Sequence, residues 1–248
     1  MLLAQCAFPN IVQLQQWLSV ISDIAAVGLL EVKPDGLVIR ASNAHTTSFI
    51  EWSIDCSIYF HYVRSFYVNV QFSDFLKLTN EWLQKGLNGA EMIFTNNRII
   101  LQHPNHEDSI FVTLSKDPFA LDAKTFFAME HLAVEFSLTE LQSIIRELSI
   151  VGKFVDIETM ANRELKLSTV GDLGEISFET KCGKCRVLQD DLSPYRSLGL
   201  HISLCDLKTI TLLNTLNSGI LRFIPNTALL FEAGGTTETR MTICIVSQ

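Results

Sequence analysis

The chain repeats its own order of helices and strands, and this repetition limits the folds it can adopt. Residues Leu14–Ser42 and Leu141–Ser168 each combine an amphipathic helix with two alternating strands separated by a polar turn. Residues Tyr67–Leu101 and Gly199–Phe231 each begin with a short strand, continue as a helix that stops near a glycine, and return to strands. Chance likeness of amphipathic segments is the alternative. We favour two similar halves, because the order and spacing of the elements match as well as their character.

Four helices are expected where apolar residues recur every three or four positions. Their expected bounds are Asn10–Ile24, Ser73–Lys85, Ser137–Val151 and Ser203–Asn217, and the first residue of each is the expected N-cap. The apolar face of the second helix is expected to hold Phe72, Phe75, Leu76, Thr79 and Leu83. The strands expected after the second and fourth helices are Glu91–Phe94, Arg98–Gln102, Ile110–Leu114, Ile220–Ile224, Ala228–Glu232 and Arg240–Val246. Strand runs separated by single helices predict an α+β fold, with two topologically similar domains of two helices against largely antiparallel sheet.

Composition narrows the class of protein further. The 248 residues are 48% hydrophobic and 19% charged, which is enough apolar material for a large core. The formal net charge of −8 means that any contact with DNA needs a local basic surface. The apolar runs fall short of the about 20 residues of a membrane helix, and Met1–Cys6 lacks the basic segment of a secretory signal. We therefore expect six reduced cysteines and a location in the cytosol or nucleus.

Two stretches of the second half resemble a known family. Arg146-Glu147-Leu148-Ser149-Ile150-Val151-Gly152 ends a predicted helix, and Leu167-Ser168-Thr169-Val170-Gly171-Asp172-Leu173-Gly174 ends a predicted strand pair. Both are similar to signatures of proliferating cell nuclear antigen (PCNA), in the DNA sliding-clamp superfamily. The first half is similar at Ile21-Ser22-Asp23, Asp35-Gly36-Leu37 and Ser42-Asn43-Ala44-His45. The resemblance runs in order over nearly the whole chain and is weakest around Cys182–Arg196 and at the C-terminus.

The resemblance implies a non-enzymatic subunit of a closed ring. It divides the chain into a first clamp domain at 1–114, a connector at 115–131 and a second clamp domain at 132–248. Strand edges left exposed at the two ends would pair between subunits, head to tail. The residues that the resemblance assigns to this subunit interface are Ser109, Ile110, Phe111, Val112, Gly174, Glu175, Ile176, Ser177 and Phe178.

The resemblance also implies what such a ring does. It would encircle double-stranded DNA without reading its sequence, act as a processivity factor for a DNA polymerase in replication and repair, and be opened by a clamp loader. The expected location is then the nucleus or a viral replication site. Motif-bearing partner proteins would dock an aromatic anchor beside the connector. The family's pocket corresponds here to Ala41, Asn43, Ala44, His45, Phe119, Leu121, Phe126, Ala228, Ile245 and Val246.

The predicted helices are poorer in positive charge than those of the family. Their cations, the candidate DNA contacts, are Lys77, Lys85, Arg146 and Lys208, against six acids on the same helices. The sequence leaves open whether the ring is a homo- or hetero-trimer. Three explanations of the low charge are open: a hetero-ring whose other members bring charge, a subunit of a heterotrimeric checkpoint clamp, or a divergent clamp, viral or cellular, that holds DNA weakly.

The sequence offers no cofactor, metal or catalytic site of its own. It has no Gly-Lys-Ser/Thr phosphate loop. Cys182-Gly183-Lys184-Cys185 has no second cysteine pair to complete a zinc site, and His103-Pro104-Asn105-His106 is typical of a hairpin turn. The competing interpretation is an enzyme or ligand-binding protein on an unrelated α+β fold, which would need a pocket with converging polar groups.

Overall fold

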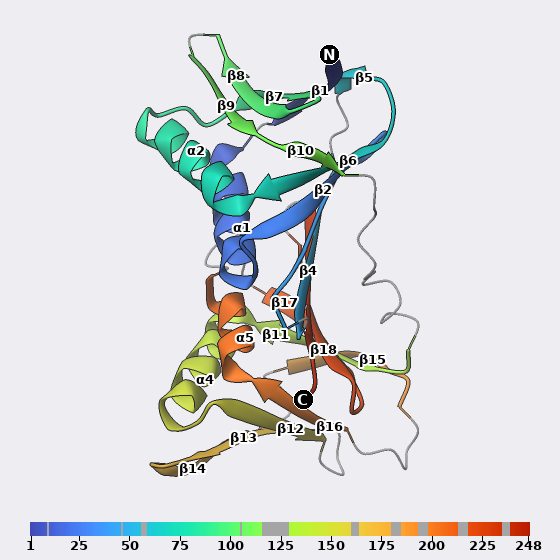
Figure 1. Cartoon of the computed structure of the whole chain (residues 1–248). Coiled ribbons are helices and arrows are strands. Elements are labelled where there is room, and N and C mark those ends of the chain that lie inside the picture. The colour runs from blue at the N-terminus through green and yellow to red at the C-terminus, as the bar shows by residue number, and fades with distance from the viewer. Residues whose placement is uncertain are drawn as a thin grey trace. The chain divides into compact units, whose positions relative to one another are not determined.

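The computed structural model describes residues 1–8, 10–45, 47–55, 59–104, 106–115, 129–159, 164–179, 185–192, 198–212, 218–234 and 239–248. The chain divides into two compact units, one built mainly from Met1–Ala44 and Ile50–Ala120, the other mainly from Leu121–Gly235 and Met241–Gln248. Figure 1 shows their elements. Most of the predicted connector lies outside the described residues.

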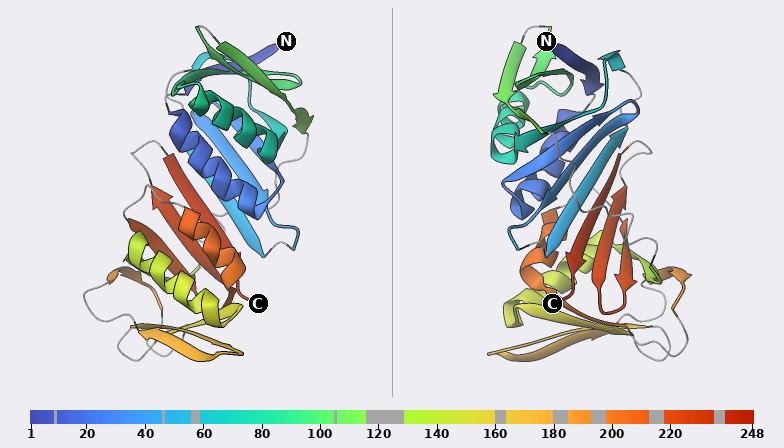
Figure 2. Two further views of the ribbon diagram at one scale, coloured as in Figure 1. Left: turned by 90° about the vertical axis from the view of Figure 1, so that its left-hand side faces the viewer. Right: turned by 45° about the vertical axis from the view of Figure 1, so that its right-hand side comes forward.

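The first unit places two helices against antiparallel strands. Its elements are β1 (Leu2–Phe8), α1 (Ile11–Ile24), β2 (Val27–Lys33), β3 (Gly36–Ser42), β4 (Ser48–Asp55), β5 (Tyr59–Tyr62), β6 (Phe66–Gln71), α2 (Phe72–Gln84), β7 (Ala90–Thr95), β8 (Arg98–His103), β9 (His106–Phe111) and β10 (Thr113–Ser115). The strands follow two spatial orders, β5-β1-β7-β8-β9 and β10-β6-β2-β3-β4. Helices α1 and α2 lie side by side against this sheet structure (Figure 2).

The second unit has the same plan. Its elements are β11 (Leu132–Ser137), α4 (Leu138–Val151), β12 (Phe154–Thr159), β13 (Leu165–Gly171), β14 (Gly174–Glu179), β15 (Cys185–Asp190), β16 (Gly199–Ser203), α5 (Leu204–Lys208), the 3₁₀ turn η1 (Thr209–Leu212), β17 (Ser218–Ile224), β18 (Ala228–Gly234) and β19 (Thr239–Val246). The strand orders are β15-β11-β17-β18-β19 and β14-β13-β12-β16. Helices α4 and α5 pack against each other.

Strand pairing confirms the repetition seen in the sequence. In the first unit β1 lies between β5 and β7, and β2 lies between β3 and β6. In the second unit β11 lies between β15 and β17, and β12 lies between β13 and β16. Each half of the chain is therefore one copy of the same α+β unit, as predicted.

The helices bury the faces that the apolar spacing indicated, with one difference. Ile11, Leu14, Leu18 and Ile21 of α1 are buried, and so are Leu138, Leu141, Ile145 and Leu148 of α4. In α2, however, Leu78 and Trp82 are fully covered, whereas Leu76 and Leu83 are only partly covered. The reason is that α2 packs against both α1 and β9, so its buried face is turned from the expected one. No described helix is both long and apolar enough to cross a membrane.

Two of the predicted helix caps form side-chain hydrogen bonds. The Asn10 side chain accepts from the Gln13 N–H at the start of α1, and Ser203 accepts from the Asp206 N–H at the start of α5. Ser137 occupies the N-cap of α4 without such a bond. Ser73 is not a cap, because β6 runs directly into α2 and Gln71 takes the N-cap position.

Candidate functional site

Two of the six described strands that end a sheet, β9 and β14, are the candidate assembly edges. Among the described residues, β9 is bonded to β8 alone and β14 to β13 alone. An end strand presents a row of backbone N–H and C=O groups that another strand can take up. Eight of the nine predicted interface residues lie on these two strands.

Strand β9 begins and ends earlier than the sequence suggested. The hairpin pairs His103 with His106, as the Pro104 turn predicted, so β9 starts at His106 and ends at Phe111. Val112, predicted at the interface, lies beyond that end. It is buried, and its N–H donates to the Asn97 carbonyl at 2.9 Å. The chain then leaves this sheet, because β10 pairs with β6.

A polar cluster ties β9 to the end of α2. The Trp82 indole N–H donates to Asp108 Oδ2 at 2.9 Å, and His106 Nε2 lies 2.6 Å from the same oxygen. Lys85 Nζ lies 2.7 Å from His106 Nε2 and 3.6 Å from Asp108 Oδ2. Burial alone would raise the pKa of the Asp108 carboxyl, but the hydrogen bonds from Trp82 and His106 and the positive charges of His106 and Lys85 hold this pKa below its usual value.

Strand β14 is positioned by a close approach of α4 to its hairpin. A Cβ on Gly171 would lie 1.8 Å from the Val151 carbonyl oxygen, so only glycine fits against the end of α4. Gly174 closes the hairpin with φ +120°, a left-handed conformation that favours glycine. Val170 and Leu173 beside this turn are 69% and 76% exposed, which leaves an uncovered apolar surface at the start of β14.

Three of the four candidate DNA contacts are accessible on the helices. Lys77 of α2, Arg146 of α4 and Lys208 of α5 are exposed and lie off the buried faces. Lys85 is exposed too, but it follows the last residue of α2 and its ammonium group pairs with Asp108 Oδ2 at 3.6 Å. We therefore remove Lys85 from the candidate DNA surface. The acids of the helices remain in excess over the three accessible cations.

The predicted partner-binding residues divide into accessible and buried ones. Asn43, Ala44 and His45, which follow β3, are accessible. Ala41, Ala228 and Ile245 are buried, and Val246 is partly exposed. Phe119, Leu121 and Phe126 lie outside the described residues, so the pocket as a whole stays a prediction.

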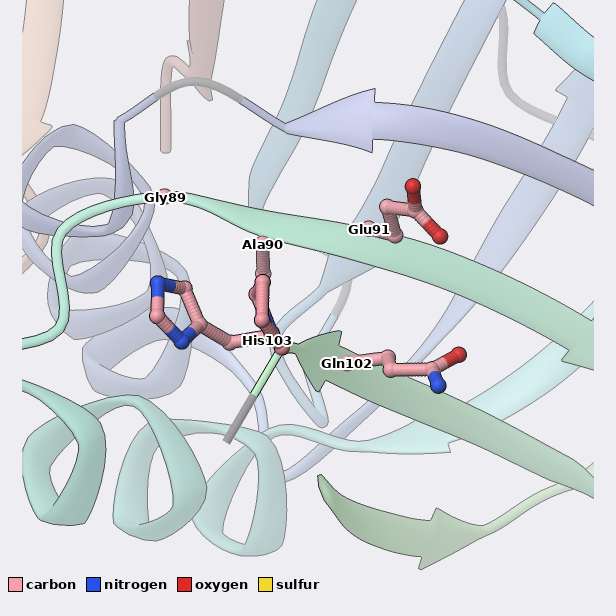
Figure 3. Close-up of a pocket in the computed structure, with 6 residues that line it drawn as sticks. Gly89, Ala90, Glu91, Gln102 and His103 are labelled. Atoms are coloured by element: carbon pink, nitrogen blue, oxygen red, sulfur yellow. The ribbon is translucent and has the colours of Figure 1, made fainter. Parts of the chain in front are cut away.

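Two described pockets differ in the polar groups that line them. One of about 380 Å³ is bordered by β7 and β8 and by the residues that precede and follow them. Figure 3 shows that the Glu91, Gln102 and His103 side chains in it point in different directions. No cluster of three His, Cys, Asp or Glu side chains suited to a metal ion occurs in the described part of the chain. A second pocket, of about 340 Å³, does bring polar side chains together, since Asp156, Glu158, His201 and Asn226 line it and His201 Nδ1 lies 2.7 Å from Asp156 Oδ1. The enzyme interpretation therefore stays an alternative.

Two ion-pair groups on the sheets escaped the sequence analysis. Arg40 of β3 bonds Glu31 and Glu51 at 2.8 Å each, and both carboxylates are largely covered. Arg222 of β17 pairs with Glu232 of β18. On the outward side of β9, Arg98 lies over the Phe111 ring, 4.5 Å from its centroid. Alternating strands identify polar positions of this kind but not their partners, which depend on register.

Comparison with solved structures shows that the chain has the fold of PCNA. PCNA from Entamoeba histolytica superposes with a TM-score of 0.79 at 11% identity, covering 100% of both chains. A chain of the PCNA2–PCNA3 complex from Sulfolobus tokodaii gives 0.75 at 13% identity, covering 98% of this chain and 99% of that one. No family model and no curated protein matches the sequence. The predicted PCNA-like α+β fold is confirmed over the full chain.

Proposed function

We propose that this protein is a subunit of a ring-forming DNA clamp, a non-enzymatic scaffold that encircles duplex DNA and holds replication and repair proteins there. The observation that carries the proposal is the repeated unit, two copies of one clamp-like plan along a chain that superposes on PCNA from end to end. Two of the strands that end a sheet, β9 and β14, would supply the edges that a ring needs.

The charge of the helices favours a topological hold over a tight electrostatic one. Each phosphate that a protein neutralises adds about 0.9 to the slope of log affinity against log salt. With Lys77, Arg146 and Lys208 accessible among an excess of acids, few such contacts form. A closed ring does not need them, since it leaves DNA only when it opens or reaches an end. Such a clamp would act where DNA is copied, in the nucleus or at a viral replication site.

A blocked-end experiment tests the proposal. The protein is loaded at high concentration onto bead-bound linear duplex through its free end, and a bulky protein block is then bound at that end. We expect the protein to survive a wash at 0.15 M salt and to be released when a restriction enzyme cuts between the blocks. Equal retention on blocked and cut duplex, or none on either with all co-purified partners present, would refute the proposal.

We further propose that partner proteins dock an aromatic anchor near Asn43, Ala44 and His45, with the connector residues as the second wall. Leu121→Ala and Phe126→Ala should each weaken a peptide carrying such an anchor by about 1–2 kcal/mol, measured by calorimetry. Gln15→Ala on α1 is the control. If both connector variants bind the peptide with the affinity of the parent, Leu121 and Phe126 do not contact it and have a structural role alone.

A further inference from the structure

His131 ties the end of the predicted connector to the sheet of the second unit. It is the last connector residue, directly precedes β11 and is 4% exposed, although its side chain is polar. Its Nδ1 lies 2.8 Å from the Met129 carbonyl oxygen, and its Nε2 lies 2.8 Å from Arg222 Nη1 on β17. Its own carbonyl accepts from the Asp191 N–H, just beyond β15, at 3.2 Å. We call these three contacts of His131 the connector latch.

The partners of His131 determine which of its ring nitrogens carries hydrogen. A carbonyl oxygen only accepts hydrogen bonds, and a guanidinium only donates them. Nδ1 therefore donates to Met129, and Nε2 accepts from Arg222. Only the neutral imidazole can do both, because a protonated ring carries hydrogen on both nitrogens. A proton on Nε2 would turn an N–H and a positive charge toward the guanidinium at hydrogen-bond distance.

The charged groups around His131 do not remove this conflict. Glu232 of β18 is buried, but its carboxylate pairs with Arg222 through Nε, whereas Nη1 meets the imidazole. Gln189 Oε1 of β15 lies 3.5 Å from the same Nη1. The other acids near His131 are exposed, and these are Glu130, Asp190 and Asp191. Solvent screens exposed charges, so the contact between the imidazole and Nη1 decides the outcome.

We infer that the connector latch is sensitive to protonation. Neutral His131 holds Met129–His131 against β15 and β17, and protonation releases this segment, because the charged ring cannot keep its contact with Arg222. The released segment binds a proton more readily than the held one, so acidification shifts the population toward release. Imidazole suits this role, since it is the side chain whose charge ordinarily changes between about pH 5 and 8.

The consequence for partner proteins rests on the docking site in the proposed function. Phe119, Leu121 and Phe126 precede His131 on the same connector. Release of the connector end would loosen the wall against which an aromatic anchor packs. Docking of such partners would therefore weaken in acid, and His131 would regulate a site that it does not itself line.

Hydrogen exchange tests the latch without any partner. The whole chain is exchanged at pH 7.5 and at pH 5.5, and mass spectrometry follows residues 129–134 and 185–192. Protection factors are compared, because they correct for the direct effect of pH on exchange. We expect the protection of both segments to fall about tenfold from pH 7.5 to pH 5.5 in the wild type.

Three variants separate His131 from other titrating groups. His131→Gln keeps an acceptor for Arg222 and cannot be protonated, so its protection should match that of the wild type at pH 7.5 and stay the same at pH 5.5. His131→Leu removes the acceptor and should show low protection at both pH values. His201→Gln changes a partly exposed histidine of the same unit, paired with Asp156 at 2.7 Å, and should keep the wild-type response.

Two results would overturn the inference. One is a wild type whose two segments keep the same protection at both pH values, or lose it together with the first unit, since release is local. The other is a pH response that survives in His131→Gln. The peptide calorimetry with Leu121→Ala and Phe126→Ala judges the partner site separately, so either proposal can fail alone.

Discussion

The indole N–H of Trp82 donates to Oδ2 of Asp108 at 2.9 Å and so joins the last turn of α2 to the end strand β9. His106 and Lys85 complete the cluster around the same carboxylate. The cluster thus holds β9, the strand proposed to pair with a neighbouring subunit, against α2 within the protomer. Order of this kind lowers the conformational entropy lost on association.

Asp108→Asn should destabilise the chain by about 1 kcal/mol at pH 7, because hydrogen bonds to a charged acceptor are stronger than those to a neutral one. The folded-state pKa of Asp108 is lowered, so its stabilisation is present above the usual carboxyl range and is lost as pH falls through the folded value. Urea unfolding of wild type and variant should therefore differ at pH 7, and the difference should shrink as the pH falls below the usual carboxyl range. Asp172→Asn in the β13–β14 turn is the control, and a constant gap across pH would contradict the assignment.

Arg40→Leu should lower the unfolding free energy by about 3 kcal/mol, because it leaves two covered carboxylates without their counter-ion. Burial by itself lowers the pKa of Arg40, but the hydrogen bonds and charges of Glu51 and Glu31 together raise it above its usual value. The guanidinium therefore stays charged. The control is Lys33→Leu, which removes a more exposed pair with Glu31 at 3.3 Å and should cost less than about 1 kcal/mol. If both variants lose a similar free energy of unfolding in chemical denaturation, the Arg40 ion pairs stabilise the fold no more than the exposed Lys33 pair does.

Gly171→Ala should destabilise the second unit by about 1–3 kcal/mol, since the new methyl group meets the Val151 carbonyl and α4 must move. Hydrogen exchange should increase most in β13 and β14. Gly199→Ala in β16 of the same sheet is the matched control, because its Cβ would have one neighbour, at 3.3 Å. Unchanged exchange in β14 would mean that the hairpin does not depend on this contact.

Cysteine labelling should separate the described thiols. Burial raises the pKa of the Cys244 thiol to about 12, so it stays protonated and unreactive at pH 8. Cys6 is also buried, whereas Cys205 on α5 is exposed. Iodoacetamide followed by peptide mass mapping should mark Cys205 within minutes and the two buried thiols only after denaturation. Rapid labelling of native Cys244 would indicate local opening of β19.

Helix caps, which depend on residues close in sequence, could be predicted from the sequence. Ion pairs between strands could not, because they depend on which strands pair and in which register. The caps at Asn10 and Ser203 act on residues three positions away, so the sequence contains all that is needed to predict them. Ser73 was wrongly predicted as an N-cap, because β6 pairs with β2 as far as Gln71 and leads directly into α2. The ion pairs of Arg40 were missed because they depend on which strands adjoin.

The candidate site shows the same division. The end strands followed from the family resemblance, but the start of β9 is fixed by the hairpin that pairs His103 with His106. That hairpin also brings His106 and Asp108 to Lys85, which changes this lysine from a candidate DNA contact into part of the β9 anchor. Charge counted along a helix cannot reveal a side chain that bonds to a strand about 20 residues later.

The exposed helix cations give the sharpest test of how DNA is held. Lys77→Glu with Lys208→Glu should lower retention on end-blocked duplex without unfolding the chain, because both side chains lie off the buried helix faces. Binding to open linear duplex should be weak in the wild type, with a shallow salt slope of about 0.9 for each phosphate contacted. Arg186→Glu is the matched control, since it reverses an exposed cation on β15 instead of a helix. Steeply salt-dependent binding to open duplex that Arg186→Glu weakens and the helix variants leave intact would place the DNA surface at the Lys181–Arg186 segment. Loss of blocked-end retention with the helix variants alone would place the DNA surface on the helices and show that their charge restrains DNA together with the ring.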